Sequence, residues 1–115
     1  MGGRRDPRLR GQLLTPAIIV AGTFRLPPER MDEARPAMAA VVAASNAEAG
    51  CLVYAYAEDV TEPGLIRVHE AWASREALDR HFAQPHMADW QRLRQALGFS
   101  DRAIVLYEVA GSQPL

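Results

Sequence analysis

The order of its hydrophobic segments constrains this chain more than any other feature. Short runs rich in β-branched and apolar residues predict four strands, at residues 17–25, 51–59, 65–72 and 103–109. Longer stretches with apolar residues every three or four positions predict helices at residues 28–47 and 74–98. The resulting order is β-α-β-β-α-β. It is typical of an α+β, ferredoxin-like fold with a four-stranded antiparallel sheet.

Proline, glycine and serine mark where the predicted helices begin, bend and end. Pro28 suits the first turn of the first helix, and Gly50 is a natural stop after it. Pro36 lies inside that helix and removes one hydrogen bond, so we expect a kink there. Ser74 is a good N-cap for the second helical stretch. Pro85 interrupts that stretch, so we expect a bend or a restart at this point.

The predicted strands are apolar on both faces. In the first strand Ile18, Val20 and Phe24 alternate with Ile19 and Ala21, and the last strand has a similar pattern. Strands that are buried on both sides have this composition. Two helices cover only one face of a four-stranded sheet, and a soluble monomer rarely exposes a whole apolar face. We therefore expect a homodimer in which two sheets face each other.

Composition narrows the class of protein. The 115-residue chain has 13 Lys+Arg against 14 Asp+Glu, so its net charge of -1 gives no reason to expect nucleic acid as a partner. No stretch approaches the ~20 apolar residues of a membrane span. A single cysteine, Cys51, excludes an internal disulfide and favours a cytoplasmic location. We predict a flexible basic tail over residues 1–14, one domain over 15–110 and a C-terminal tail over 111–115.

Two longer motifs are more specific than these patterns. Residues 45–54 read SNAEAGCLVY, which fits S-x-x-E-x-G-C-x-x-Y. Residues 70–81 read EAWASREALDRH, which fits E-x-W-x-S/D-x-x-A-L-x-x-H. Together with the Pro-His pair at 85–86 and Trp90, they resemble the antibiotic biosynthesis monooxygenase (ABM) family. The resemblance extends over residues 17–109.

The resemblance implies a homodimeric α+β barrel with a pocket in each subunit, between the helices and the sheet. Members of this family include cofactor-free monooxygenases that oxidise hydroquinones and polyketide-type aromatics, haem-degrading enzymes, and proteins without an assigned activity. The haem-degrading branch has an asparagine in the first strand. Residues 17–23 read AIIVAGT and contain no asparagine, which argues against haem degradation.

Three residues form the predicted catalytic group. His81 matches the histidine of the second motif, and an imidazole is suited to removing a phenolic proton. Glu70 and Trp72 lie two apart on one strand and share a face. We expect Glu70 to pair with His81 or an arginine, and Trp72 to stack on an aromatic substrate. A buried structural histidine and a core tryptophan are the alternatives.

Further residues are predicted to bind the substrate. His86 lies at a helix start, and Trp90 follows on the same helical face. Arg92, or its neighbour Arg94, would stabilise a phenolate or peroxide anion, with a solvated helix face as the alternative. His81 and His86 are five residues apart with a proline between them, which disfavours the usual i, i+4 pairing of metal ligands. We therefore predict no metal and no organic cofactor.

These features lead to one functional hypothesis and two alternatives. An electron-rich phenolate can pass an electron to O2 directly, so a base in an aromatic pocket suffices for oxidation. We predict a cofactor-independent monooxygenase that acts on a hydroquinone-like or polycyclic aromatic compound. The alternatives are a dimeric module that binds a hydrophobic metabolite without turnover, and another reaction on the same scaffold, such as isomerisation or haem breakdown.

Overall fold

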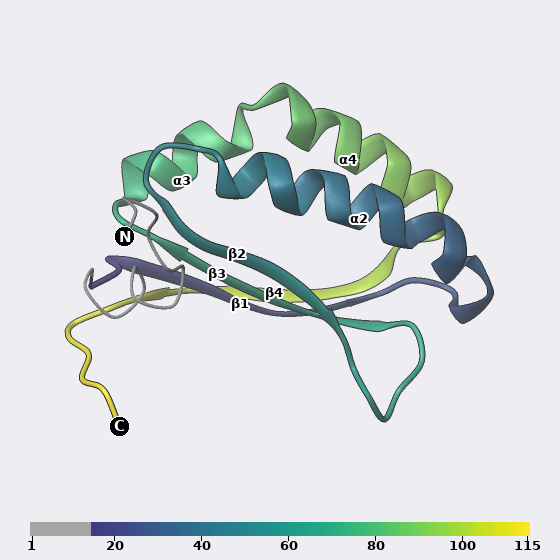
Figure 1. The fold of residues 1–115 in the computed structure, drawn as a ribbon, viewed down its shortest axis with the longest axis horizontal. Helices are drawn as coiled ribbons and strands as arrows, with labels where there is room; N and C mark the ends of the chain where they lie inside the picture. The colour runs from purple at the N-terminus through teal and green to yellow at the C-terminus, as the bar shows by residue number, and fades with distance from the viewer. Residues whose placement is uncertain (1–14) are drawn as a thin grey trace, which may run out of the picture.

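The computed structural model describes residues 15–115 and contains a four-stranded sheet covered by helices (Figure 1). The predicted basic tail over residues 1–14 lies outside the described residues. The strands are β1 (Ile18–Arg25), β2 (Cys51–Glu58), β3 (Leu65–Trp72) and β4 (Ser100–Glu108). The helices are the 3-10 turn η1 (Pro28–Arg30), α2 (Met31–Asn46), α3 (Arg75–Phe82) and α4 (Pro85–Ala96). Within the described residues no helix has the length and apolarity needed to cross a membrane.

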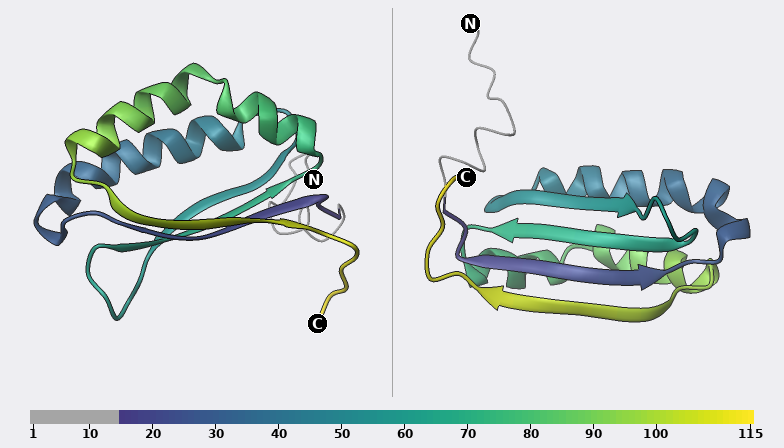
Figure 2. Two further views of the ribbon diagram at one scale, coloured as in Figure 1. Left: turned by 180° about the vertical axis from the view of Figure 1, so that it is seen from behind. Right: turned by 90° about the horizontal axis from the view of Figure 1, so that it is seen from below.

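The sheet has the strand order β2-β3-β1-β4, and each neighbouring pair is antiparallel. The helices all lie on one face of this sheet, as Figures 1 and 2 show. This is the predicted ferredoxin-like α+β architecture. β4 begins at Ser100, before the predicted start at residue 103, and Asp101 there has a φ of 52°. Apolar alternation does not reveal such an irregular strand end.

The first helix begins later than the sequence suggests. Residues 28–30 form a single 3-10 turn, and α2 begins at Met31. Pro36 lies inside α2, and the helix continues through it to Asn46. Because Pro36 is exposed, water can reach the carbonyl group that loses its helical partner. Helical spacing in the sequence predicts one apolar stripe of Met31, Ala34, Met38, Val41, Val42 and Ser45. All of these residues are buried except Val42, which is partly buried.

The predicted restart at Pro85 divides the second helical stretch into α3 and α4. Ser74 caps α3, since its Oγ accepts a hydrogen bond of 3.1 Å from the backbone N–H of Ala77. Pro85 begins α4, where its missing N–H costs no helical hydrogen bond. The break lets the end of α3 and the start of α4 approach each other. The ring centroids of His81 and His86 consequently lie 6.1 Å apart.

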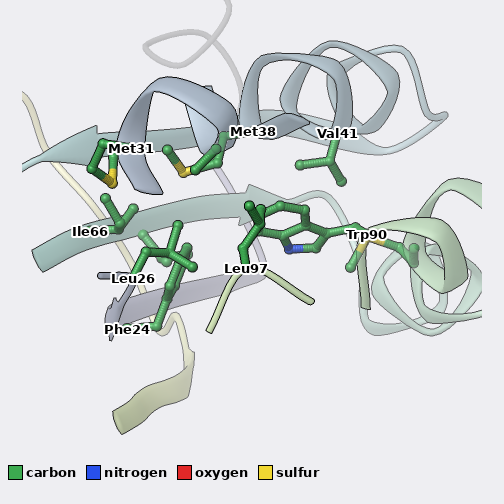
Figure 3. Close-up of a cluster of buried hydrophobic side chains, with 11 residues drawn as sticks. Phe24, Leu26, Met31, Met38, Val41, Ile66, Trp90 and Leu97 are labelled. Carbon is green, nitrogen blue, oxygen red and sulfur yellow. The ribbon is translucent and has the colours of Figure 1, made fainter. Parts of the chain in front are cut away.

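The hydrophobic core lies between the helices and the sheet. Figure 3 shows side chains of α2 above those of β1 and β3, with Trp90 of α4 to one side. Its labelled members are Phe24, Leu26, Met31, Met38, Val41, Ile66, Trp90 and Leu97. A second buried cluster continues under α3, around Trp72 and Leu78. Side chains fill most of the space between the helices and the sheet, but a groove of about 230 Å³ remains between α2 and the strands β2 and β3, and smaller spaces lie next to α4.

The opposite face of the sheet has no covering element among residues 15–115. We call it the open face and define it by Ile19, Ala21, Val53, Val105 and Tyr107. Strand pairing puts Tyr107 beside Ile19 and Val105 beside Ala21. Val105 and Tyr107 remain 50% and 53% exposed. An apolar sheet face thus meets solvent in the single chain, as the alternation in the sequence predicts.

Candidate functional site

A small cavity lies between the sheet and the helices α3 and α4. Its volume is about 50 Å³, and all four strands contribute residues to its wall. The aromatic and polar residues that line it are Phe24, Tyr54, Tyr56, Glu70, His81, Phe82, Arg94 and Arg102. A few polar groups in an otherwise apolar recess are the usual composition of a small-molecule site. The cavity lies where the sequence analysis expects a pocket.

Glu48 holds two imidazole rings beside this cavity. Its Oε2 lies 2.7 Å from Nδ1 of His81 and 2.7 Å from Nε2 of His86. The exposed fraction of the side chain rises from 1% for His81 through 10% for Glu48 to 24% for His86. We call these residues the Glu–His–His cluster. His81 and His86 lie on different helices and so do not form an i, i+4 pair on one helix face, but the break between α3 and α4 turns both rings toward Glu48.

The hydrogen bond to Glu48 fixes which nitrogen of His81 carries the proton. A carboxylate has only acceptors, so Nδ1 of His81 is the N–H donor. Burial lowers the pKa of His81 below its ordinary value, although Glu48 acts in the opposite direction. His81 is therefore neutral at neutral pH, with the lone pair on Nε2. Since His81 lines the cavity, Nε2 is the ring nitrogen left for a ligand there.

Backbone contacts fix the turn that carries Glu48. Its N–H donates to the carbonyl of Ser45 at 3.1 Å, and its carbonyl accepts from the N–H of Cys51 at 3.2 Å. Gly50 has a φ of 83°, and a Cβ there would lie 2.5 Å from the Cβ of Ala77, so the turn packs closely on α3. Sequence reasoning missed Glu48 although the first motif contains it, because helical periodicity ends before this turn.

Glu70 has a different partner from the one expected. Its Oε1 accepts a 3.0 Å hydrogen bond from the indole Nε1 of Trp72, whereas the partner of His81 is Glu48. Trp72 is the nearest donor because it lies on the same face of the same strand. Burial raises the pKa of Glu70 to about 7, against the opposing effects of the Trp72 N–H and the positive charge of Arg102. A carboxyl group that is partly protonated at neutral pH therefore faces the cavity.

The two tryptophans pack in the core next to the residues that line the cavity. Trp72 is fully buried, and its ring centroid lies 4.8 Å from that of His81. Trp90 packs against Phe24 and Tyr56, with ring centroids 6.3 Å and 6.0 Å away. Neither tryptophan belongs to the residues that line the cavity. Trp72 and Trp90 are thus core residues in this state.

Tyr54 and Tyr56 form the aromatic wall of the cavity instead. They lie two apart on β2, so they share a face, and their hydroxyl oxygens are 3.1 Å apart. Burial raises the pKa of both phenols, so both are neutral hydrogen-bond donors at neutral pH. Sequence reasoning did not select this pair, although the first motif ends at Tyr54.

Arg94 lines the cavity, and Arg92 does not. Arg92 is exposed and forms an ion pair with Asp89 on the outer side of α4. The guanidinium carbon of Arg94 lies 4.4 Å from the ring centroid of Phe99. Its Nε has no hydrogen-bond partner among residues 15–115. Residues two apart on a helix point about 200° away from each other, so only one of the two arginines can face the sheet.

Comparisons with known proteins agree with this fold. The family model for antibiotic biosynthesis monooxygenase matches residues 17–93. The uncharacterised protein sll1783 of Synechocystis is 31% identical over 98 residues, which cover 85% of this chain and 67% of that protein. A candidate antibiotic biosynthesis monooxygenase from Deinococcus radiodurans, with a solved structure, is 26% identical and has a TM-score of 0.80, covering 85% of this chain and 97% of that one.

A second solved structure, PA3566 from Pseudomonas aeruginosa, is also 26% identical. Its TM-score is 0.72, and the match covers 85% of this chain and 98% of that one. The family model spans more than half of the chain and includes the Glu–His–His cluster together with β1, β2, β3 and α3. The chain therefore belongs to the antibiotic biosynthesis monooxygenase family.

Proposed function

We propose that this protein is a cofactor-independent monooxygenase that oxidises a hydroquinone-like aromatic compound with O2. One observation carries the proposal. Glu48 accepts the Nδ1–H of His81, which leaves the lone pair of Nε2 for a ligand in the cavity. His81 is then the general base, and Glu48 orients it. The orienting role expected for Glu70 passes to Glu48 in this proposal. Membership of the family supports the same class of reaction.

The reaction balances with O2 as the only co-substrate. His81 removes a phenolic proton, and the phenolate passes one electron to O2. The resulting superoxide joins a ring carbon, and the proton that His81 returns completes a hydroperoxide there. The O–O bond then breaks as the same ring carbon loses its hydrogen, so that water leaves and a carbonyl forms, which tautomerises to the C–OH of the product. Overall, a hydroquinone and O2 give a hydroxyquinone and water. Two phenolic O–H bonds become carbonyls, one ring C–H becomes C–OH, and four electrons reduce O2.

The polar lining of the cavity suits the anions of this sequence. Arg94 and Arg102 bring positive charge to the wall, and the Nε of Arg94 has no hydrogen-bond partner among residues 15–115. Fixed donors aimed at a developing oxyanion stabilise it strongly in a recess that excludes water. Protonated Glu70 is a further donor. The aromatic rings of Tyr54 and Tyr56 provide a stacking surface in place of Trp72.

The size of the cavity restricts the substrate. About 50 Å³ is less than one aromatic ring needs, since an engineered cavity of about 150 Å³ binds benzene. Phe82, which is 56% exposed, and the exposed Arg102 both line the cavity, so its mouth consists of movable side chains. We expect these two side chains to swing outward on binding. A single-ring hydroquinone then fits more readily than a polycyclic one.

We also infer that the working form is a homodimer. The open face carries Val105 and Tyr107, which are half exposed, beside the partly buried Ile19 and Ala21. The exposed His69 and Arg67 of β3 lie on the same face, but most of its residues are apolar, and a large apolar surface is uncommon on a soluble monomer. The helix-covered face already holds the cavity, so a second copy seated on the open face leaves the site accessible.

Oxygen uptake with a panel of hydroquinones tests the proposed activity. The wild-type chain should consume one O2 per hydroxyquinone formed and release no H2O2, so that added catalase leaves the uptake unchanged. Glu48→Gln and His81→Gln should each lower kcat at least a hundredfold, because they remove the orienting carboxylate and the base. Glu76→Gln is the matched control, since Glu76 is an exposed carboxylate in the first turn of α3.

Two results would contradict the activity. Uptake that Glu48→Gln and His81→Gln leave unchanged would exclude His81 as the base. Thermal stabilisation by the same compounds without any O2 uptake would favour the binding module over the enzyme.

A further inference from the structure

We propose that Glu48, His81 and His86 form a binding site for one divalent transition-metal ion of the Zn²⁺ class, and that the bound ion switches off His81 as a base. The first half of this proposal is independent of the proposed function, and the second half rests on it. The ion would occupy the centre of the Glu–His–His cluster, on the side of His81 away from the cavity.

The donor set is the first argument. Two imidazole nitrogens and one carboxylate oxygen are a common ligand set for Zn²⁺ sites that keep a fourth position for water. Imidazole also suits Cu²⁺ and Ni²⁺, whereas Mg²⁺ and Ca²⁺ prefer oxygen ligands. The three ligand atoms are Oε2 of Glu48, Nδ1 of His81 and Nε2 of His86, and they all lie within 4.8 Å of one another. The cluster therefore has the chemistry of a zinc site.

The direction of the side chains is the second argument. Nδ1 of His81 and Nε2 of His86 both point at the same oxygen of Glu48 from 2.7 Å. Each of these two ring nitrogens is therefore directed toward the place that a metal ion bound to Glu48 would occupy. Ligand bonds of about 2.0–2.2 Å to a shared ion require only that the carboxylate and the rings move apart slightly. The carboxylate can do so by rotation about the side-chain bonds of Glu48, without movement of the backbone turn.

The third argument is the solvent access of the cluster and the charge of the Glu48 carboxylate. His86 is 24% exposed and Glu48 10% exposed, so an ion can enter from solvent without crossing the core. Among residues 15–115, the side-chain partners of the Glu48 carboxylate are these two imidazoles, and no arginine neutralises it. A dication would thus meet a carboxylate without an arginine partner and two imidazole nitrogens in a largely buried place. That arrangement favours binding over release.

The consequence for His81 follows from its tautomers. Without metal, the proton lies on Nδ1 and the lone pair on Nε2. A metal bound at Nδ1 needs the lone pair at that atom, so the single proton of neutral His81 moves to Nε2. Nε2 then becomes a donor toward the cavity and can no longer accept a phenolic proton. Metal binding and base catalysis at His81 therefore exclude each other.

Titration of the tag-free, chelator-treated full chain with Co²⁺, followed by displacement with Zn²⁺, tests the site. We expect one Co²⁺ per chain with the visible absorption of a low-coordinate nitrogen and oxygen site, which Zn²⁺ abolishes. Glu48→Gln and His86→Gln should each weaken binding at least tenfold, because each removes a ligand. Glu76→Gln should bind like the wild type. Circular dichroism of each variant establishes that the fold is intact.

The metal site, the switch and the proposed function would each be overturned by a different result. A wild-type chain that takes up neither ion at millimolar concentration would overturn the site, as would His86→Gln that binds as tightly as the wild type. If the site binds as expected, one equivalent of Zn²⁺ should abolish O2 uptake, and a chelator should restore it. Zinc binding with unchanged uptake would overturn the switch. A chain that binds zinc but oxidises no hydroquinone would refute the proposed function and leave the site intact.

Discussion

A single carboxylate oxygen organises the polar end of this protein. Oε2 of Glu48 is the shared acceptor for two imidazoles that belong to different helices. Sequence reasoning predicted His81 as a base and expected Glu70 to pair with His81 or an arginine, whereas the carboxylate hydrogen-bonded to His81 is that of Glu48. The reason is physical. The alternation of side chains along a strand predicts which face of the sheet Glu70 lies on. A residue in the turn after α2 belongs to no helical or strand periodicity, so the direction of its side chain cannot be predicted in this way.

The sequence also does not determine whether Arg92 or Arg94 lines the cavity. Helical spacing predicts that the two arginines point in nearly opposite directions, but it does not predict which of them faces the sheet. That depends on how α4 is rotated about its axis, and Trp90, which is 1% exposed, sets this rotation by packing against Phe24 and Tyr56. The residues that line the cavity are therefore decided by tertiary packing.

Glu70 should make stability fall as pH rises. Its folded pKa of about 7 lies above the ordinary value of 4.5 because burial opposes the charge. The folded protein keeps a proton that the unfolded chain releases between these values, so the free energy of unfolding decreases as pH rises through that window. Glu70→Gln removes this titration and retains an oxygen that accepts the Trp72 N–H.

Urea unfolding at about pH 4 and about pH 8 measures the effect. The measured quantity is the free energy of unfolding of Glu70→Gln minus that of wild type. This difference should be larger at the higher pH than at the lower pH by on the order of 2–3 kcal/mol. Comparison with wild type cancels the titration of the other carboxylates. A difference that is the same at both pH values would show that Glu70 does not hold its proton in the folded state.

At the scale of the elements, strands were easier to predict than helix boundaries. The four strands follow from runs of apolar residues, and β3 has the predicted bounds. The start of α2 is less predictable, because Pro28 fits the first turn of either a 3-10 turn or an α-helix. The break at Pro85 was predicted, but its consequence, the meeting of His81 and His86, depends on the angle between two helices.

The cap of α3 should matter for both stability and the site. Ser74→Ala removes the acceptor for the Ala77 N–H and should lower the free energy of unfolding by about 1 kcal/mol, as measured by urea unfolding. Ser112→Ala, in the exposed segment after β4, is the control and should have no effect. Equal stability of both variants would mean that the Ser74 hydrogen bond contributes nothing to α3.

At the scale of the whole molecule, the uncovered sheet is the dominant feature. The two-sided apolar pattern of the strands predicts an open face, and the structure has one. Light scattering after size exclusion should give twice the 12.7 kDa of one chain. Tyr107→Glu should shift the protein toward the monomer, because it buries a charge in the proposed interface.

Leu93→Glu provides the matched control for this experiment. Leu93 is 49% exposed on α4, away from the open face, so the variant should keep the wild-type mass. A wild-type mass of one chain at micromolar concentration would contradict the homodimer. So would a Tyr107→Glu variant that stays as dimeric as Leu93→Glu.

The protonation state of His81 decides whether the cavity contains a base, and it can be measured directly. Long-range proton–nitrogen correlation spectra of the metal-free protein at neutral pH report which ring nitrogen carries hydrogen. We predict a neutral His81 with hydrogen on Nδ1, held by Glu48, and a free lone pair on Nε2. An imidazolium ring, or a neutral ring with hydrogen on Nε2, would contradict the proposal that His81 accepts the proton of the substrate.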